Sequence, residues 1–229
     1  ILTSENYVLN GENIIVDNKN KIINSEKNAI LFDEENNQIF LENFEYSSEK
    51  NLFKSIGLIK IQDKNENIYE FSQIYIDTNK KEILGTDTKA FLNQDSFKIN
   101  KKNKPRVFSN STNIKQDESS FEKSIFTLCD YRENDKCPPW TIQSKKMLHD
   151  KLKKTIYYNN ALIKVYNVPI FYFPRLSHPD PTVDRRSGFL PPSISSSKNL
   201  GNGLAIPYFF NMGIDKNLTV TNRLYVSEN

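Results

Sequence analysis

The chain has 229 residues, enough for one or two domains with a substantial core. Hydrophobic residues make up 37% and aromatic residues 12%, which fits a folded, β-rich body. With 31 basic and 28 acidic side chains the net charge is +3, too balanced to indicate a nucleic-acid-binding protein. No apolar run approaches the roughly eighteen residues of a membrane helix. The chain begins ILTSEN, without a start methionine or signal peptide, so we expect a mature or truncated piece.

Residues 1–128 consist of short apolar runs separated by Asn, Asp, Lys and Glu clusters, which predicts a string of β-strands. A weak internal repeat, Asp-x5-Ile, occurs within this pattern. The Asp is expected to cap a turn and the Ile to begin the returning strand, so each copy predicts a β-hairpin. Because the copies are unevenly spaced, we expect no solenoid of fixed period. The copies are Asp17 with Ile23, Asp33 with Ile39, Asp77 with Ile83 and Asp150 with Ile156.

The positions one and three before each Asp are apolar except for His149, and at strand period two these side chains share a face. The residues between them are apolar as well, so both faces of the sheet carry apolar side chains. This favours a sheet folded over itself. The pairs are Ile14 and Val16, Ile30 and Phe32, Ile74 and Ile76, and Met147 and His149, with Ile15, Leu31, Tyr75 and Leu148 between them.

The segments at residues 101–106 and 109–120 are the most polar and predict a loop within the fold. Strands are expected to resume over residues 138–173. The prolines that follow, from Pro174 to Pro192, predict a break in strand pairing and a domain boundary near Ser187. Beyond it, two further alternating segments predict strands, at residues 204–210 and 218–226.

The chain has two cysteines, Cys129 and Cys137, spaced C-x7-C. Two thiols and two distant histidines do not make a four-ligand zinc site, and we expect neither a metal nor another cofactor. A local disulfide between the two cysteines and a pair of free thiols both fit the residues. An oxidising compartment such as the periplasm is favoured.

The strongest candidate for catalysis is the segment His178–Pro179–Asp180, where an imidazole and a carboxylate lie close in sequence. No nucleophile in a strained turn and no glycine-rich phosphate loop accompany it. We therefore interpret His178 and Asp180 as parts of a structural turn, bonded to backbone groups, and expect no enzymatic activity.

Three segments carry a resemblance to a known family: CPPWTIQSKKMLHDKLKKTIYYNNALIKVYN (137–167), VPIFYFPRLSHPDPTVDRRSGFLPP (168–192) and LGNGLAIPYFFNMGIDKNLTVT (200–221). They resemble the LPS-assembly outer-membrane proteins (LptD, also called OstA). The resemblance is dense over residues 129–221 and limited to the general pattern over 1–128. It implies an all-β chain, with an open β-jellyroll at residues 1–186. The first strands of a truncated transmembrane β-barrel would follow at residues 187–229.

The resemblance implies lipopolysaccharide transport and insertion into the outer membrane, with the jellyroll groove shielding the lipid's acyl chains. Arg185 and Arg186 would contact the phosphorylated head group, and Pro192 and Pro207 would weaken strand pairing at a lateral gate. Cys129 would bridge to the far C-terminus of the barrel; Cys137 matches the family less securely. The residues alone equally fit the packed core of an ordinary β-sandwich. The expected lipid-binding residues are Ile14, Val16, Ile30, Phe32, Ile39, Leu41, Ile74, Ile76 and Ile83.

The implied partners are lipopolysaccharide, a periplasmic bridge jellyroll (LptA-like), a lipoprotein plug in the barrel (LptE-like), and the outer membrane itself. The bridge protein would add its strands at an N-terminal sheet edge formed by residues 1–10 and 14–16. Two alternatives remain open: a soluble periplasmic adaptor jellyroll without a barrel, and a carbohydrate-binding β-sandwich. Strands in residues 187–226 would argue against the adaptor, and exposed aromatic platforms would favour the carbohydrate binder.

Overall fold

The computed structural model describes residues 2–3, 7–93, 105–127, 140–180, 183, 185–190, 193–197 and 201–226, all of them in strands, turns or irregular segments. The chain divides into two compact units, residues 1–182 (unit 1) and 183–229 (unit 2). The sequence predicts a boundary four residues later, at 186/187. The described part of the chain holds no helix long and apolar enough to cross a membrane.

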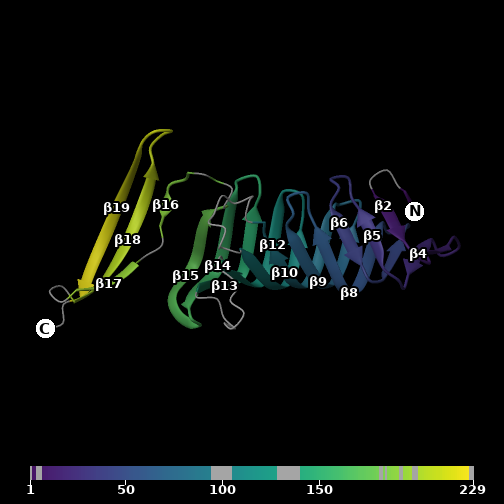
Figure 1. The fold of residues 1–229 in the computed structure, drawn as a ribbon, viewed down its shortest axis with the longest axis horizontal. Helices are drawn as coiled ribbons and strands as arrows, with labels where there is room; N and C mark the ends of the chain where they lie inside the picture. Colours follow the sequence, from purple (N-terminus) through teal and green to yellow (C-terminus); the bar gives the residue numbers. More distant parts are fainter. Residues whose placement is uncertain are drawn as a thin grey trace. The chain divides into compact units, whose positions relative to one another are not determined.

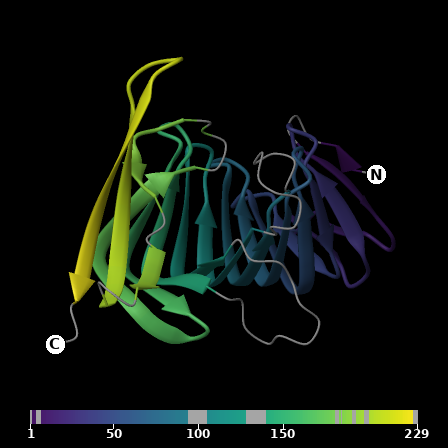
Figure 2. The same cartoon turned by 60° about the vertical axis from the view of Figure 1, so that its left-hand side comes forward.

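Unit 1 is one antiparallel sheet in which most strands pair with their neighbours in the sequence. Figures 1 and 2 show these strands following one another side by side, from the N-terminal strands to β15. The predicted all-β, antiparallel fold is confirmed. The strands are β1 (Leu2–Thr3), β2 (Val8–Gly11), β3 (Ile15–Asp17), β4 (Ile22–Ser25), β5 (Ala29–Phe32), β6 (Gln38–Leu41), β7 (Phe44–Ser47), β8 (Leu52–Gln62), β9 (Ile68–Asp77), β10 (Glu82–Phe91), β11 (Arg106–Ile114), β12 (Glu118–Thr127), β13 (Trp140–Asp150), β14 (Thr155–Val165) and β15 (Val168–Pro179).

The four Asp-x5-Ile segments form antiparallel hairpins, as the sequence predicts. In each hairpin the Asp carboxylate accepts hydrogen bonds of 2.9–3.1 Å from backbone N–H groups of its own turn, which confirms its capping role. The donors are Lys19 and Asn20 for Asp17, Glu35 and Asn37 for Asp33, Asn79 and Lys80 for Asp77, and Lys153 for Asp150.

The turn at residues 33–37 is one residue longer than the turn at residues 78–81. A shift of one residue in register moves every side chain of a strand to the other face. In the hairpin with the longer turn, the Ile of the motif therefore pairs with Leu31, whereas in the other hairpin it pairs with Ile76.

The expectation that Ile30 and Phe32 share a face with Ile39 is therefore wrong. Leu31, which lies between them, pairs with Ile39 and has an exposed fraction of 0%. Because neighbouring residues of a strand point to opposite faces, Ile30 and Phe32 lie on the outer face, where both are partly exposed.

The turns of unit 1 lie in two rows, and each row repeats every 30 residues up to residue 93. Within one row, the Ser48 and Thr78 N–H groups donate to the Lys21 and Asn51 carbonyls, both at 3.0 Å. The expectation of no fixed period is therefore wrong for this part of the chain. The copies at Asp17, Asp33 and Asp77 are unevenly spaced because they alternate between the two rows. Residues with positive φ mark the repeat: Lys21, Asn51 and Lys81 in one row, and Asn36 and Glu66 in the other.

Each long strand bends, so the sheet folds over itself, as the sequence predicts. β9 has ten residues, about 33 Å when straight, and runs from the turn at 63–67 to the turn at 78–81. Nevertheless Lys81 Nζ lies 2.8 Å from Glu34 Oε2, and Glu34 belongs to the turn beside 63–67. Only a doubled sheet brings the two ends of a strand this close together.

The bend falls near the middle of each strand, where the ladder is irregular. In β8 the register shifts between Ile56 and Ile59, around Gly57, whose φ is 124°. Asp87 has a positive φ of 51° thirty residues later, in β10. Small buried hydroxyls occupy the inside of the bend farther along, where Ser124 and Ser144 hydrogen bond to each other at 2.8 Å. Bulges and small side chains together let the two halves of the sheet approach each other.

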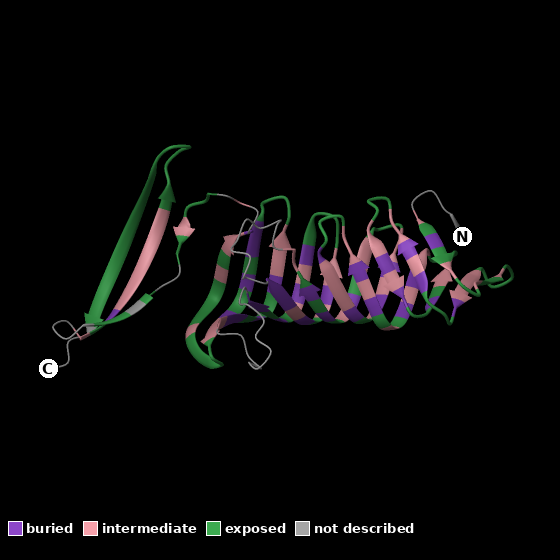
Figure 3. Cartoon of the chain, in the orientation of Figure 1, coloured by how far each residue is buried: buried purple, intermediate pink, exposed green. Residues whose placement is uncertain are grey.

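Two apolar clusters fill the fold, and in Figure 3 buried positions alternate with more exposed ones along most of the long strands of unit 1. The first cluster lies between β2 and β9, and the second between β10 and β14. The first consists of Leu9, Ala29, Leu31, Ile39, Leu41, Phe44, Phe53, Ile59, Ile61, Phe71, Ile74 and Ile76; the second consists of Ala90, Val107, Phe121, Phe126, Ile142, Met147, Ile156, Tyr158 and Ala161.

The loop predicted at residues 109–120 is wrong, because this segment belongs to β11 and β12. The polar composition of the segment led to the wrong prediction, because several of its hydroxyl groups face inward and form hydrogen bonds with one another. Ser109 and Thr112, both buried, lie 2.7 Å apart through their side-chain oxygens. Small hydroxyl side chains can therefore line an inner face once their hydrogen bonds are made.

The expected break in pairing after Pro174 is also wrong, since β15 continues to Pro179 and pairs with β14 along its length. The reason is that β15 is the last strand of the sheet. A proline on an edge strand can point its nitrogen away from the ladder, where no donor is needed.

Unit 2 is a small antiparallel sheet, and the strands predicted at 204–210 and 218–226 are confirmed as its two longest strands. The pairing between these two is continuous from Asn202 to Asn211. The strands are β16 (Gly188–Phe189), β17 (Ser193–Ser197), β18 (Gly201–Asn211) and β19 (Asn217–Val226).

Candidate functional site: a charged-rimmed apolar groove

A groove of about 600 Å³ runs inside the folded sheet of unit 1. Its walls are built from the inward faces of strands β6 to β14, so residues far apart in the sequence contribute to one continuous surface. The apolar side chains in its lining are Ile39, Ile61, Ile76, Ile83, Ala90, Leu92, Val107, Ile114, Phe121, Phe126, Met147 and Ile156.

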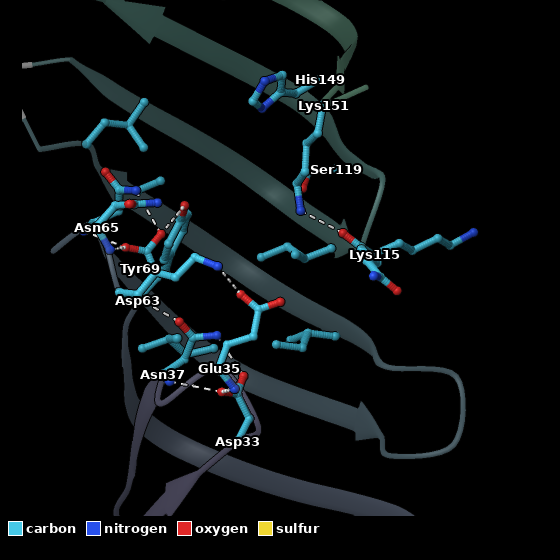
Figure 4. A pocket seen from close by; sticks show the side chains of 18 of the residues that line it. Asp33, Glu35, Asn37, Asp63, Asn65, Tyr69, Lys115, Ser119, His149 and Lys151 are labelled. Atoms are coloured by element: carbon cyan, nitrogen blue, oxygen red, sulfur yellow. Dashed lines mark hydrogen bonds and ion pairs between the residues drawn. The ribbon is translucent and has the colours of Figure 1, made fainter. Parts of the chain in front are cut away.

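The mouth of the groove is bordered by the two rows of turns, and the rows differ in charge. One lip, formed by the turns at 33–37 and 63–67, contributes four carboxylates to the lining of the groove, those of Asp33, Glu34, Glu35 and Asp63; we call it the acidic lip. The other lip, formed by the turns that end β9, β11 and β13, carries Lys81, Lys115 and Lys151; we call it the basic lip. Figure 4 shows Asp33, Glu35 and Asp63 on one side and Lys115 with Lys151 on the other.

Opposite charges face each other across the mouth. The ion pair between Lys81 and Glu34 joins the two lips directly. Within the acidic lip, Lys64 Nζ lies 2.6 Å from Glu35 Oε2. This hydrogen bond, helped by the more distant charges of Lys151 and Lys81, holds the pKa of Glu35 below its usual value.

The acidic lip is also stabilised by hydrogen bonds along the row. Asn37 donates to Asp33 Oδ2 at 2.7 Å and accepts, through Oδ1, from the Lys64 N–H of the next turn at 3.0 Å. Asn67 repeats this arrangement with Asp63 and with the N–H of Asn93. Consecutive turns are therefore fixed to one another, which gives the acidic lip a rigid backbone.

At the end of the groove near β15, His149 belongs to the lining, and the His178 ring packs against Phe126 with their centroids 6.0 Å apart. His149 Nε2 lies against Asp180 Oδ2, in contact but not aligned as a hydrogen bond. Tyr158 and His178 hydrogen bond at 2.9 Å, and the other ring nitrogen of His178 lies 2.7 Å from the Pro179 carbonyl oxygen. The turn expected at His178 is therefore wrong, because His178 belongs to β15 and pairs with Ile156. The expected backbone contact of its ring is present, whereas the Asp180 side chain faces His149 and only its backbone N–H bonds to the Lys154 carbonyl.

We predict that unit 1 loses stability as the pH falls below about 6.5. Burial lowers the pKa of His178, although the Pro179 carbonyl and Asp180 oppose this effect, while His149 adds to it. The unfolded chain therefore takes up the proton first, so the stabilisation is complete above pH 6.5 and disappears as pH falls toward the folded-state pKa. Thermal unfolding of the wild type and of His178→Gln between pH 5 and 8 measures this. An equally steep decline in the variant would show that another group is responsible.

The structure places the expected lipid-binding residues in three kinds of position. Ile39, Ile76 and Ile83 line the groove. Leu41 and Ile74 belong to the first core cluster and do not line it. The others are outside both groups: Ile14 packs against that cluster from its margin, Val16 has an exposed fraction of 50%, and Ile30 and Phe32 lie on the outer face.

Sequence reasoning missed the groove residues of β11 and β12, because it assigned most of that segment to a loop. Val107, Phe121 and Phe126 lie in the groove wall. The alternation of apolar and polar residues around Phe121 and Phe126 could have predicted strand β12, but the surrounding serines and glutamates obscured it. The basic lip was missed too, since its lysines are adjacent only in the folded sheet.

The residues expected to contact the head group or form the gate lie in unit 2. Arg185 donates from its guanidinium to the carbonyls of Ile214 and Lys216, and Arg186 is exposed. The Pro207 carbonyl accepts a 2.9 Å hydrogen bond from the Leu190 N–H. Since N–H and C=O of one residue point to the same side of an antiparallel strand, the N–H that Pro207 lacks is missing on the side of β16 and β17. Pro192, Cys129 and Cys137 lie outside the described residues.

Among the described residues, no three His, Cys, Asp or Glu side chains come together as a metal site would require.

These features define an open β-jellyroll: an antiparallel sheet folded over an apolar groove. Comparison with known proteins gives a more particular likeness, to LPS-assembly protein LptD. The protein of that name from Paraburkholderia xenovorans is 32% identical over 111 residues, which is 48% of this chain and 14% of the relative. Those from Nitrosococcus oceani and Legionella pneumophila are 32% and 33% identical over 107 and 104 residues, or 46% and 45% of this chain.

The resemblance seen in the sequence is therefore confirmed over about half of the chain. The matched part spans only 12–14% of these relatives. No family model matches the chain.

Proposed function

We propose that this chain is the N-terminal part of an LPS-assembly protein and acts without catalysis, by holding lipid acyl chains in its groove. The observation that carries the proposal is the apolar groove of about 600 Å³ along the inside of the folded sheet. The similarity to LptD supports lipopolysaccharide as the ligand. An apolar groove suits acyl chains because each CH2 transferred from water into apolar surroundings is stabilised by about 0.8 kcal/mol.

The charged mouth supports an amphiphile rather than a purely apolar ligand. Side chains that line the walls are apolar, whereas those at the two lips are ionised and exposed. A molecule with acyl chains and a polar head would place each part in matching surroundings. An ordinary β-sandwich core has no such continuous passage from apolar wall to charged rim.

The proposal includes a location and partners. Unit 1 would lie in the periplasm, and unit 2 would begin a barrel in the outer membrane. A bridge jellyroll would add strands next to β1 and β2, which lie at the end of the sheet. A lipoprotein plug would fill the barrel. Pro207 would weaken the ladder toward β16 and β17, as a lateral gate requires, and Arg185 and Arg186 would meet the lipid where it leaves the groove.

Photo-crosslinking in cells tests the groove. A crosslinking residue at Ile83 or Ile114, both partly exposed in the groove wall, is expected to capture lipopolysaccharide. The matched controls are Ile56 and Leu58, apolar residues with exposed fractions of 50% and 65% that do not line the groove. Equal capture at both pairs, or capture at neither, would refute the proposal.

A further inference from the structure

The lysines of the basic lip are spaced regularly along the edge of the sheet. Lys81, Lys115 and Lys151 come from the turns that join β9 to β10, β11 to β12 and β13 to β14, so successive lysines are two strands apart. With strands about 4.8 Å apart, the turns that carry them follow one another at about 10 Å. All three side chains line the groove from the same side of its mouth.

The interactions of these ammonium groups with acceptors in the protein become weaker from Lys81 to Lys151. Lys81 has a close carboxylate in Glu34. Lys115 has only looser ones, since its Nζ lies 3.7 Å from Glu82 Oε1 and 3.8 Å from Glu118 Oε1. Lys151 donates at 2.7 Å to a neutral acceptor, the main-chain carbonyl of Lys115.

Lys151 is the least compensated of the three. Although its side chain reaches solvent, its partial burial at the mouth lowers its pKa, against the opposing effect of Glu35, Asp117 and Asp63. Figure 4 shows it directed toward Lys115 rather than toward the acidic lip. An ammonium group in these surroundings would gain from an anionic acceptor that approaches from the mouth.

The carboxylates of the acidic lip compete only in part with an incoming anion for the lysines of the basic lip. The carboxylates of Asp33 and Asp63 are already bound by N–H groups of their own turns. Glu35 is held by Lys64. These bonds disperse the negative charge of the acidic lip. The ammonium groups of the basic lip still have N–H donors that an anion can bind.

We propose that the basic lip is a binding site for the phosphate groups of the lipid's head, with Lys115 and Lys151 at its centre and Lys81 at one end. This rests on the proposed function, because the acyl chains in the groove would place the head group at the mouth. Phosphate is a strong acceptor for ammonium donors and can contact more than one lysine. The row would then hold the head group at successive positions as the lipid moves along the groove.

The test measures binding of the 229-residue chain to two lipids: a bis-phosphorylated, multiply acylated glucosamine disaccharide and its dephosphorylated counterpart. The wild type is expected to bind the phosphorylated lipid roughly tenfold more tightly at low salt, and this preference should fall as salt is added. The triple variant Lys81→Gln, Lys115→Gln, Lys151→Gln should bind both lipids with the affinity that the wild type has for the dephosphorylated one.

A second triple variant matches the charge change: Lys60→Gln, Lys89→Gln, Lys123→Gln. These lysines do not line the groove, so the preference for the phosphorylated lipid should remain. Excess inorganic phosphate should reduce the preference without displacing the dephosphorylated lipid. Circular dichroism establishes that both variants keep the fold.

The outcomes separate this inference from the proposed function. If the wild type bound both lipids equally, or the basic-lip variant kept the full preference, the phosphate site would be refuted and the groove would stand. If the dephosphorylated lipid did not bind at all, the groove itself would be refuted.

Discussion

Ile83→Asp is expected to abolish lipid capture while unit 1 stays folded, whereas Ile74→Asp is expected to unfold it. Ile83 is partly exposed and lines the groove, so a carboxylate there remains in contact with water and disrupts only the apolar wall. Ile74 has an exposed fraction of 0% in the core and does not line the groove. An ionised group buried at that position without a partner costs several kcal/mol, which is comparable with the stability of a whole domain.

Circular dichroism and lipid crosslinking of the two variants check this expectation. Unfolding by Ile83→Asp would show that the groove is a sealed core, and capture of lipid by that variant would show that the apolar wall is not needed. Ile76 is less suitable for the comparison. It lines the groove but has an exposed fraction of only 2%, so a charge there would affect folding and binding together.

Gly85→Ala is expected to destabilise unit 1 by about 1–3 kcal/mol. A methyl group at this glycine would lie 2.2 Å from Cδ1 of the Phe71 ring. The ring cannot easily move, because Phe71 is 3% exposed and belongs to the first core cluster. The substitution therefore forces a shift of the sheet or of the ring.

Urea unfolding measures the loss, and Phe71→Leu provides the decisive second variant. If the clash is the cause, the double variant should be more stable than the sum of the single effects predicts. Additive effects would contradict this explanation. Gly188→Ala is the control, since a methyl group there would have no heavy atom within 4 Å.

The hairpins and the folded sheet could be predicted from the sequence because turn signals and strand periodicity are local. The faces of the strands could not, because they depend on turn length. The two kinds of turn do differ in sequence. Asn occupies the fourth position after Asp in the longer turns, as Asn37 and Asn67, while Lys21 and Lys81 occupy it in the shorter ones.

The 30-residue period was hidden by single substitutions in its motif. Positions 17, 47 and 77 are equivalent in the repeat, but position 47 holds Ser47 where the other two hold Asp17 and Asp77. In the other row, Tyr69 replaces the isoleucine expected six residues after Asp63. These replacements preserve the turn but remove the sequence pattern. Backbone conformation recurs where residue identity does not, so only the structure shows that the repeat is regular.

The charged lips could not be predicted from sequence spacing, because their members are brought together by the bend. Lys81 and Glu34 are separated by 47 residues and meet only when the strands double back. Part of the apolar wall could be predicted from the sequence. Where the register of a strand was assigned correctly, the isoleucines at every second position are the ones that point inward.

The 30-residue repeat has a consequence for the length of the groove. Each repeat crosses the folded sheet twice, so this part of the groove can lengthen or shorten only in steps of about 10 Å. A deletion of one whole repeat would join equivalent turns and leave the remaining pairs in register, whereas a deletion of an odd number of residues within a strand would turn its inward face outward. In the part of the sheet that carries this repeat, the length of the groove wall is therefore set in whole units, independently of the side chains that line it.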